Sequence, residues 1–236
     1  MSKAILHIKK LIKKYDEKEV LKEVDYSFED GNIYGIIGRN GAGKTTLFNC
    51  ISNNLEFNSG EILIEENQQI RKLSFDDVGI VSDNPVLPEF LTGFEFINMF
   101  MKYHSNAHSK TIDEYFHLIN ISQRDQHKII KSYSFGMKNK IQLLCCLIKN
   151  PKIILLDEPL SSFDMIVSHD IKKLLVEMRC EHIILMSTHI LQLATDISDK
   201  VVFLKNGHLI DSAHDVVASG DFEAYIISEL SQEEIQ

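Results

Sequence analysis

One short segment limits what this chain can fold into more than any other part of it. Residues 38–46 read Gly-Arg-Asn-Gly-Ala-Gly-Lys-Thr-Thr, directly after an apolar run at 33–37. Leu47, Phe48 and Ile51 follow at helical spacing. A glycine-rich loop between a buried strand and a helix is the context in which a chain binds phosphate groups. The segment therefore predicts an α/β fold with a nucleoside triphosphate site at the end of that strand.

Each residue type in this loop has a physical task. Glycine permits torsions that turn successive N–H groups toward a polyphosphate, and the following helix points its positive end at the same place. We expect Lys44 to bring a charge to the terminal phosphates of ATP and the Thr45 hydroxyl to bind Mg²⁺. An ordinary glycine-rich turn is the alternative, and lysine and threonine in register disfavour it. The predicted nucleotide-binding residues of the loop are Gly38, Asn40, Gly41, Ala42, Gly43, Lys44, Thr45 and Thr46.

Composition narrows the class of protein further. Of the 236 residues, 44% are hydrophobic and 25% are charged, as in an ordinary folded domain. The net charge of -9 gives no general attraction to nucleic acid, so we expect no nucleic-acid partner. No apolar run approaches the length of a membrane span. The four cysteines form no Cys-x-x-Cys pair, which favours reduced, buried thiols and a cytoplasmic location.

Strand and helix patterns alternate along the chain. Helical spacing dominates from about residue 91 to residue 149, and strand patterns lie on both sides of it. We therefore expect one domain, with a nucleotide-binding α/β core at 1–84 and 150–236 and a helical subdomain inserted at 85–149. The expected strands cover residues 4–11, 24–28, 33–37, 60–64, 78–81, 153–156, 183–186 and 201–204.

A second group of chemical residues follows the apolar run at 153–156. Asp157 and Glu158 come at the end of this expected strand, where ligands of open α/β sheets bind. Asp157 is suited to hold Mg²⁺, and Glu158 to polarise a water molecule for attack on the terminal phosphate. A solvent-exposed acidic turn is the alternative for this pair, and Lys44 and Thr45 together disfavour it.

Three further motifs occur in a fixed order. Ser134-Phe135-Gly136-Met137 precedes the Asp157 strand, Ser161-Ser162-Phe163-Asp164 follows it, and Ser187-Thr188-His189 ends a later strand. With the phosphate loop first, this order resembles the nucleotide-binding domain of an ATP-binding cassette protein over essentially the whole chain. The resemblance implies a P-loop NTPase core with a RecA-like mixed sheet, N-terminal antiparallel strands and an inserted helical subdomain. It also implies that Tyr15 stacks on adenine. Packing of Tyr15 on the protein surface is the alternative.

The resemblance implies that two copies of the chain are needed for catalysis. In this family the signature motif of one subunit completes the ATP site of the other, so Ser134 and Gly136 would act on the partner's ATP. Donors at a helix N-terminus suit the charge that spreads over the transferring phosphate. By the same resemblance, Glu158 would activate water, His189 would hydrogen-bond the γ-phosphate, and Asp164 would link the two sites.

Three positions depart from the family pattern. Asp83 stands where a glutamine usually connects Mg²⁺ and the attacking water to the membrane partner. A ligand role for Asp83 and a turn-forming role before Asn84 are both open. Phe135 replaces the first glycine of the signature, and Lys140 replaces a common arginine.

The resemblance implies an ATPase subunit of a transporter that works on an integral membrane permease and lies on the inner face of the cell membrane. The Tyr-Ser-Phe-Gly-Met-Lys form of the signature looks most like cassettes that export drugs or antimicrobial peptides. A soluble cassette ATPase that remodels ribosomes or DNA is the alternative, but such relatives usually carry two cassettes or a long coiled coil. A P-loop kinase or GTPase is a third possibility, and the Asn-Lys-x-Asp motif that selects guanine is absent.

Overall fold

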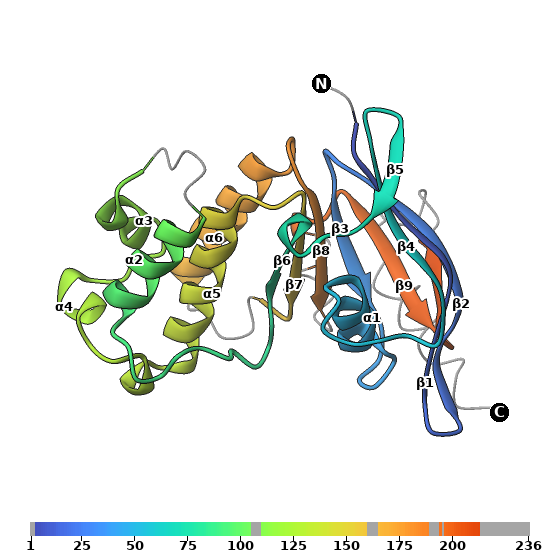
Figure 1. Cartoon of the computed structure of the whole chain (residues 1–236), viewed down its shortest axis with the longest axis horizontal. Coiled ribbons are helices and arrows are strands. Elements are labelled where there is room, and N and C mark those ends of the chain that lie inside the picture. The colour runs from blue at the N-terminus through green and yellow to red at the C-terminus, as the bar shows by residue number, and fades with distance from the viewer. Residues whose placement is uncertain (1–2, 105–109, 160–164, 189–193, 195, 213–236) are drawn as a thin grey trace.

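A computed structural model describes residues 3–104, 110–159, 165–188, 194 and 196–212 of the chain. Within these ranges the chain forms two β-sheets with helix α1 between them, and further helices cover the other face of the larger sheet (Figure 1). None of the helices in these ranges combines the length and the apolar character that a bilayer crossing requires.

The larger sheet positions the site. Its described strands follow the order β10-β9-β3-β8-β7-β6, and all neighbours are parallel except β9 and β10. Strands β3, β7 and β8 are buried along their whole length, so they form continuous apolar runs in the sequence. Their carboxyl ends meet at one edge, where Ile37 pairs with Thr188 and Asp157 pairs with Ser187. The strands are β3 (Ile33–Ile37), β6 (Val78–Val81), β7 (Ile153–Asp157), β8 (Ile183–Thr188), β9 (Lys200–Lys205) and β10 (His208–Asp211).

The smaller sheet is antiparallel throughout, in the order β2-β1-β4-β5. Its inner face packs on α1 (Lys44–Ile51), and Leu6 of β1 shares one buried cluster with Leu47 and Phe48 of α1. This packing fixes α1, and therefore the loop in front of it, between the two sheets. The strands are β1 (Ile5–Tyr15), β2 (Lys18–Glu29), β4 (Ser59–Glu66) and β5 (Gln69–Lys72).

Successive residues of β7 face opposite sides of the larger sheet, as the pleat requires. Ile153 and Leu155 join the cluster between the sheets, whereas Ile154 and Leu156 pack with Leu143 of helix α5 (Phe135–Lys149) and with helix α6 (Met165–Met178). The sheet is thus covered on both faces.

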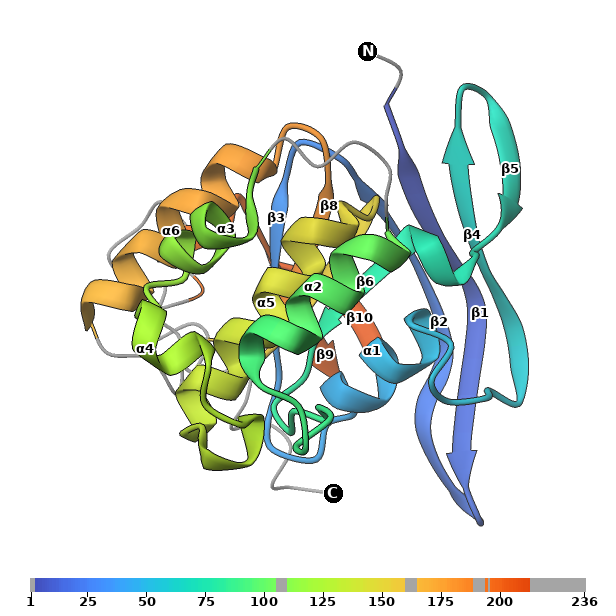
Figure 2. The ribbon, with the colours of Figure 1, turned by 60° about the vertical axis from the view of Figure 1, so that its left-hand side comes forward.

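The helices of residues 93–149 have a buried cluster of their own, which includes Ile97, Phe116, Ile141 and Leu144. Figure 2 shows α2 and α5 in front of the larger sheet. The division of the chain at residues 84/85 and 149/150 into core and helical subdomain stays a prediction. The helices are α2 (Gly93–Tyr103), α3 (Ile112–Leu118), α4 (Gln123–Gln126), α5 (Phe135–Lys149) and α6 (Met165–Met178), with short 3-10 turns at Phe75–Asp77 and Ile130–Ser132.

Helix α5 has a polar cap at each end. Ser134 is the N-cap, and its hydroxyl accepts a hydrogen bond from the Met137 N–H at 3.2 Å. Asn150 ends the helix in the left-handed conformation, with φ of 50°, and Pro151 follows.

Several sequence-based predictions need correction. Strands β1 and β2 are longer than the predicted 4–11 and 24–28, because their antiparallel pairing continues through three register shifts as far as Tyr15 and Lys18. Strand β5 was missed because all of its side chains are exposed and give no apolar pattern. Helix α6 was not predicted either. Among the cysteines, Cys50 and Cys146 are buried as expected, but Cys180 is exposed.

Candidate functional site

The phosphate loop connects β3 to α1 and depends on two glycines with positive φ. Gly41 has φ of 81° and Gly43 has φ of 106°. A side chain at Gly43 would be strained by this torsion, and its Cβ would lie 2.8 Å from Cγ1 of Val20. The helix starts at the next residue, Lys44. The loop can therefore turn its backbone N–H groups and the amino end of α1 toward one point.

The Lys44 side chain lies under this loop and is almost fully buried. Its Nζ donates to the carbonyl oxygens of Gly38 at 2.7 Å and Arg39 at 3.3 Å. Burial lowers the pKa of Lys44, and the carboxylates of Glu158 and Asp157 oppose that shift. The ammonium group is thus held between the loop and two acidic side chains.

A hydrogen bond joins the start of α1 to the end of β7. The Thr45 hydroxyl donates to Oδ2 of Asp157 at 2.7 Å. Only 3% of the Asp157 surface is exposed. Its other oxygen, Oδ1, accepts a hydrogen bond from the hydroxyl of Ser187 on β8. Two hydroxyl donors therefore compensate for the burial of this carboxylate.

Glu158 follows β7 in a backbone conformation that is uncommon for a residue with a side chain, with φ of 51°. Its N–H group is 3.2 Å from the backbone oxygen of Ser187 and 3.2 Å from the Ser187 hydroxyl. This contact holds the turn at the end of β7 against the end of β8. The turn brings the Glu158 side chain to the cavity in front of the phosphate loop.

One cavity of about 530 Å³ collects most of the predicted site residues. Asp83, after β6, lies at this cavity together with Asp157. Burial raises the pKa of Asp83, and repulsion from Asp157 adds to that rise. The lining residues are Val20, Asn40, Gly41, Gly43, Lys44, Thr45, Thr46, Asp83, Phe135, Asp157 and Glu158. The arrangement offers backbone donors, one cation and three carboxylates around a space of the size that a phosphate chain needs.

Comparison with known proteins decides the family. The family model described as ABC transporter matches residues 21–161, which include the phosphate loop, the signature and Asp157. This chain belongs to the ABC transporter family. It is an ATP-binding subunit and an ATPase of that family. The family therefore accounts for the phosphate loop and for the acidic residues opposite it.

Two curated relatives illustrate the similarity. An uncharacterized ABC transporter ATP-binding protein, YdbJ of Bacillus subtilis, is 31% identical over 214 residues, which are 89% of this chain and 69% of the relative. The bacitracin transport ATP-binding protein BcrA of Enterococcus faecalis is 25% identical over 215 residues, 89% of this chain and 69% of the relative. This chain therefore spans about two thirds of the length of both relatives.

Two solved structures share the cassette fold. The ATP-binding subunit of an ABC transporter superposes with a TM-score of 0.79 at 26% identity, over 96% of this chain and 99% of that one. A dimeric, post-hydrolysis ATP-binding cassette, MJ0796 bound to ADP and Pi, gives a TM-score of 0.71 at 21% identity, over 86% of this chain and 96% of that one. The α/β cassette fold predicted from the sequence is confirmed.

The other predicted site residues of this ABC cassette either do not line the cavity or fall outside the described ranges. Tyr15 ends β1 with 46% of its surface exposed, and Nζ of Lys13 lies 4.9 Å from its ring centroid. Ser134 and Gly136 lie at the start of α5, where Ser134 caps its own helix. Gly38 and Ala42 belong to the phosphate loop without lining the cavity. The sequence predictions also name His189 and Asp164, which fall outside the described residues.

Two residues at the site were missed by sequence reasoning. Ser187 was noted only as part of the motif before His189, yet its hydroxyl contacts Asp157. Its signal was weak, because only the pairing of β7 with β8 places it there. Phe135 was noted as a bulky replacement in the signature, and the structure brings it to the cavity of its own chain.

The donors at this edge of the sheet fit Mg²⁺. Thr45 and Asp157 supply a hydroxyl and a carboxylate, and hard cations prefer oxygen ligands. Among the described side chains, no three histidine, cysteine, aspartate or glutamate residues gather as a metal site of their own. Binding of Mg²⁺ with only a few protein ligands and with phosphate oxygens is the usual arrangement at nucleotide sites.

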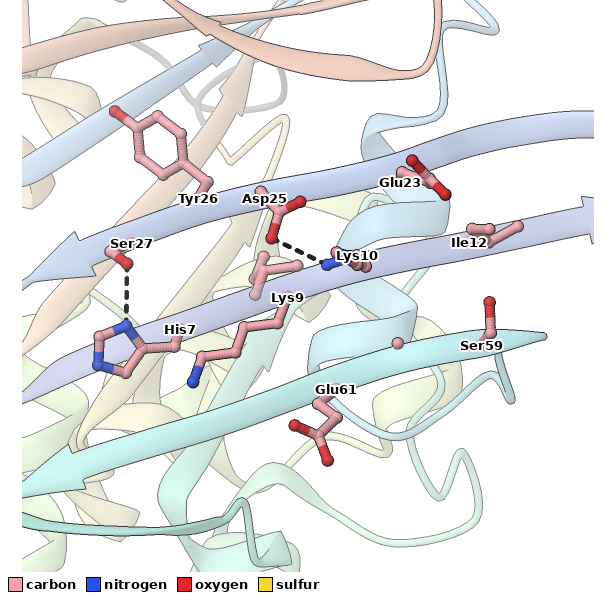
Figure 3. A pocket seen from close by; sticks show the side chains of 12 residues that line it. His7, Lys9, Lys10, Ile12, Glu23, Asp25, Tyr26, Ser27, Ser59 and Glu61 are labelled. Atoms are coloured by element: carbon pink, nitrogen blue, oxygen red, sulfur yellow. Dashed lines mark hydrogen bonds between the residues drawn. The ribbon is translucent and has the colours of Figure 1, made fainter.

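A second, wide cavity lies elsewhere in the cassette. It has a volume of about 860 Å³ and lies on the outer face of the smaller sheet (Figure 3). There His7 of β1 contacts the Ser27 hydroxyl at 2.9 Å and the Glu65 carboxylate at 3.0 Å. No residue of the phosphate loop lines this cavity. The phosphate loop and the acidic residues therefore make the cavity of about 530 Å³ the candidate nucleotide site, independently of its size.

Proposed function

We propose that this ATPase energises a separate integral membrane permease, and that a homodimer of the chain closes on ATP and opens after hydrolysis. The observation that supports the proposal most directly is the cavity that joins the phosphate loop to Asp157 and Glu158. On this proposal the chain lies on the cytoplasmic face of the cell membrane through its permease.

Thr45 and Asp157 would hold Mg²⁺, with Asp83 as a further oxygen donor. The bound ion would neutralise charge on the β- and γ-phosphate oxygens. The Thr45 hydroxyl donates to Asp157 at 2.7 Å, and the lone pairs of its oxygen stay available to the ion. Ser187 helps to keep Asp157 in place, because its hydroxyl donates to the opposite carboxylate oxygen.

Lys44 and Glu158 would carry the catalytic work within one subunit. The Lys44 ammonium would exchange its bonds to the carbonyls of Gly38 and Arg39 for phosphate oxygens. Glu158 would orient a water molecule and accept its proton. His189 would bond the γ-phosphate, Tyr15 would stack on adenine, and Asp164 would link the two sites, all by resemblance to the family.

Ser134 and Gly136 would complete the ATP site of the partner subunit. The capped amino end of α5 offers donors and a positive helix end. Phe135 beside it keeps 49% of its surface exposed, which suits a surface that a second copy covers. A cassette that shares this fold is dimeric in its structure with ADP and Pi, which is consistent with a dimer.

A groove between β6 and the helices would receive the permease. It has a volume of about 620 Å³, and apolar side chains of Val86, Leu87, Phe96 and Phe100 line it beside Asp83. Val86 is 91% exposed. Exposed apolar residues around a hollow are typical of a protein contact.

The cargo is proposed from similarity alone. The signature resembles those of drug and antimicrobial-peptide exporters, and one relative is named for bacitracin transport at 25% identity. We propose export of a compound of this kind.

The variant Glu158→Gln tests the mechanism. We expect it to bind ATP, to accumulate as a dimer in size-exclusion chromatography with light scattering, and to lose at least about hundredfold in turnover, because the base that activates water is removed. Turnover at the wild-type rate would exclude Glu158 as the base.

Purification of the protein from its native membrane tests the proposed partner. A co-purifying polytopic protein supports the proposal, whereas ribosomes or DNA would support the soluble alternative.

A further inference from the structure

One side-chain amide of α5 is bonded to the backbone at the end of β6. Oε1 of Gln142 accepts from the Ser82 N–H at 3.0 Å and from the Ser82 hydroxyl at 3.2 Å, and Nε2 of Gln142 donates to the Ser82 carbonyl at 3.3 Å. The amide thus pairs with both backbone polar groups of a single residue, as a neighbouring strand would. This contact joins positions that are 60 residues apart in the sequence.

Helix α5 is attached to β6 at a second place, two turns further along the helix. Nζ of Lys149 donates to the carbonyl of Phe75 at 2.6 Å and to that of Val78 at 2.9 Å. Lys149 therefore holds the beginning of β6, and Gln142 holds its end. Between them Gly79 lets the helix approach, since a Cβ there would lie 3.0 Å from Sγ of Cys146.

The two attachments differ in what lies next to them. Ser82 directly precedes Asp83, which lines the nucleotide cavity together with Thr45 and Asp157. Gln142 and Lys149 both line the adjoining groove, to which the same three residues contribute. The Lys149 attachment lies at the other end of β6, by Phe75 and Val78. Of these two attachments, the Gln142 contact is therefore the one next to a residue that lines the nucleotide cavity.

We propose that Gln142 is a positioning residue for the ATP site: its amide fixes the backbone of Ser82 and thereby sets where the Asp83 carboxylate stands relative to Thr45 and Asp157. The inference rests on the proposed role of Asp83 at the Mg²⁺ ion. Because α5 is one helix from Phe135 to Lys149, the same contact ties the position of Asp83 to the helix that carries the signature.

Three single variants and one double variant of the full chain test this inference. Gln142→Met keeps the length of the side chain and removes the amide, and Lys149→Met removes the other attachment as a matched control. Asp83→Ala and the double variant Gln142→Met/Asp83→Ala complete a thermodynamic cycle. The measurements are the affinity for a fluorescent ATP analogue with Mg²⁺ and with EDTA, and the thermal midpoint of unfolding.

We expect Gln142→Met to weaken Mg²⁺-dependent binding of the analogue about tenfold, because a carboxylate displaced by a fraction of an ångström loses its ligand geometry. Binding in EDTA should stay unchanged. Lys149→Met should lower the thermal midpoint without changing the effect of Mg²⁺. The double variant should bind like Asp83→Ala alone, because Gln142 acts through Asp83.

Three results would overturn the inference, each in a different way. If Asp83→Ala reduces Mg²⁺-dependent binding and Gln142→Met does not, Gln142 only supports the fold, and the role of Asp83 survives. If Asp83→Ala leaves the effect of Mg²⁺ unchanged, the proposed role of Asp83 is wrong, and the positioning role is excluded with it. If the losses of Mg²⁺-dependent affinity of the two single variants multiply in the double variant, Gln142 acts by a route other than Asp83.

Discussion

The hydroxyl of Ser187 gives the sharpest test of how the acidic side of the site is held. Ser187 is fully buried on β8, and its hydroxyl donates to Oδ1 of the buried Asp157. The variant Ser187→Ala removes this donor, so that Oδ1 of the buried Asp157 carboxylate loses its hydrogen bond from Ser187. The Glu158 N–H keeps its contact with the Ser187 backbone oxygen at 3.2 Å, so we count only the bond to Asp157.

A hydrogen bond to a charged group contributes about 1.5–3 kcal/mol. We therefore expect Ser187→Ala to lower the free energy of unfolding by about 2 kcal/mol. For a chain of this size that corresponds to a fall in thermal midpoint of roughly 4–8 °C. The measurement is urea and thermal unfolding of the nucleotide-free protein at neutral pH.

The chain contains a matched control for this deletion. The Ser198 hydroxyl is also buried, and among the described residues it has no hydrogen-bond partner. Ser198→Ala removes the same atom without breaking a bond, so it should be neutral or slightly stabilising. Equal loss of stability in Ser187→Ala and Ser198→Ala would refute the argument that Asp157 depends on this hydroxyl.

Two further predictions concern the nucleotide. Lys44→Ala should weaken ATP binding by about 3 kcal/mol, or roughly hundredfold, because it deletes the charge beneath the phosphates; unchanged affinity in an equilibrium titration would contradict the proposed role of the loop. Asp83→Gln restores the residue usual in the family, and we expect ATP hydrolysis to persist or rise; activity at background level would show that the carboxylate itself is required.

Local patterns were sufficient to predict the elements that carry the site. Strands β3 and β7 are visible in the sequence as continuous apolar runs. A glycine-rich loop follows β3, and the carboxylates of Asp157 and Glu158 come at the end of β7. The end of α5 at Asn150 also follows from the sequence, because asparagine tolerates the left-handed conformation of a helix C-cap and the next residue is a proline. Strand β5 and the length of β1 could not be predicted, because their exposed residues are placed by pairing with β4 and β2.

The contacts that tune the site depend on the order of strands in space. The sequence separates Ser187 from Asp157 by 30 residues, and Gln142 from Ser82 by 60 residues. No local sequence pattern predicts either contact, because a buried serine or a helical glutamine can have many partners. The amino-acid sequence alone determined the chemistry of this protein, because the phosphate loop and the acidic pair are defined by short-range backbone geometry and residue type. The tertiary structure alone decided which side chains hold Asp157 and Asp83 in place, because β8 lies between β3 and β7 and α5 packs along β6.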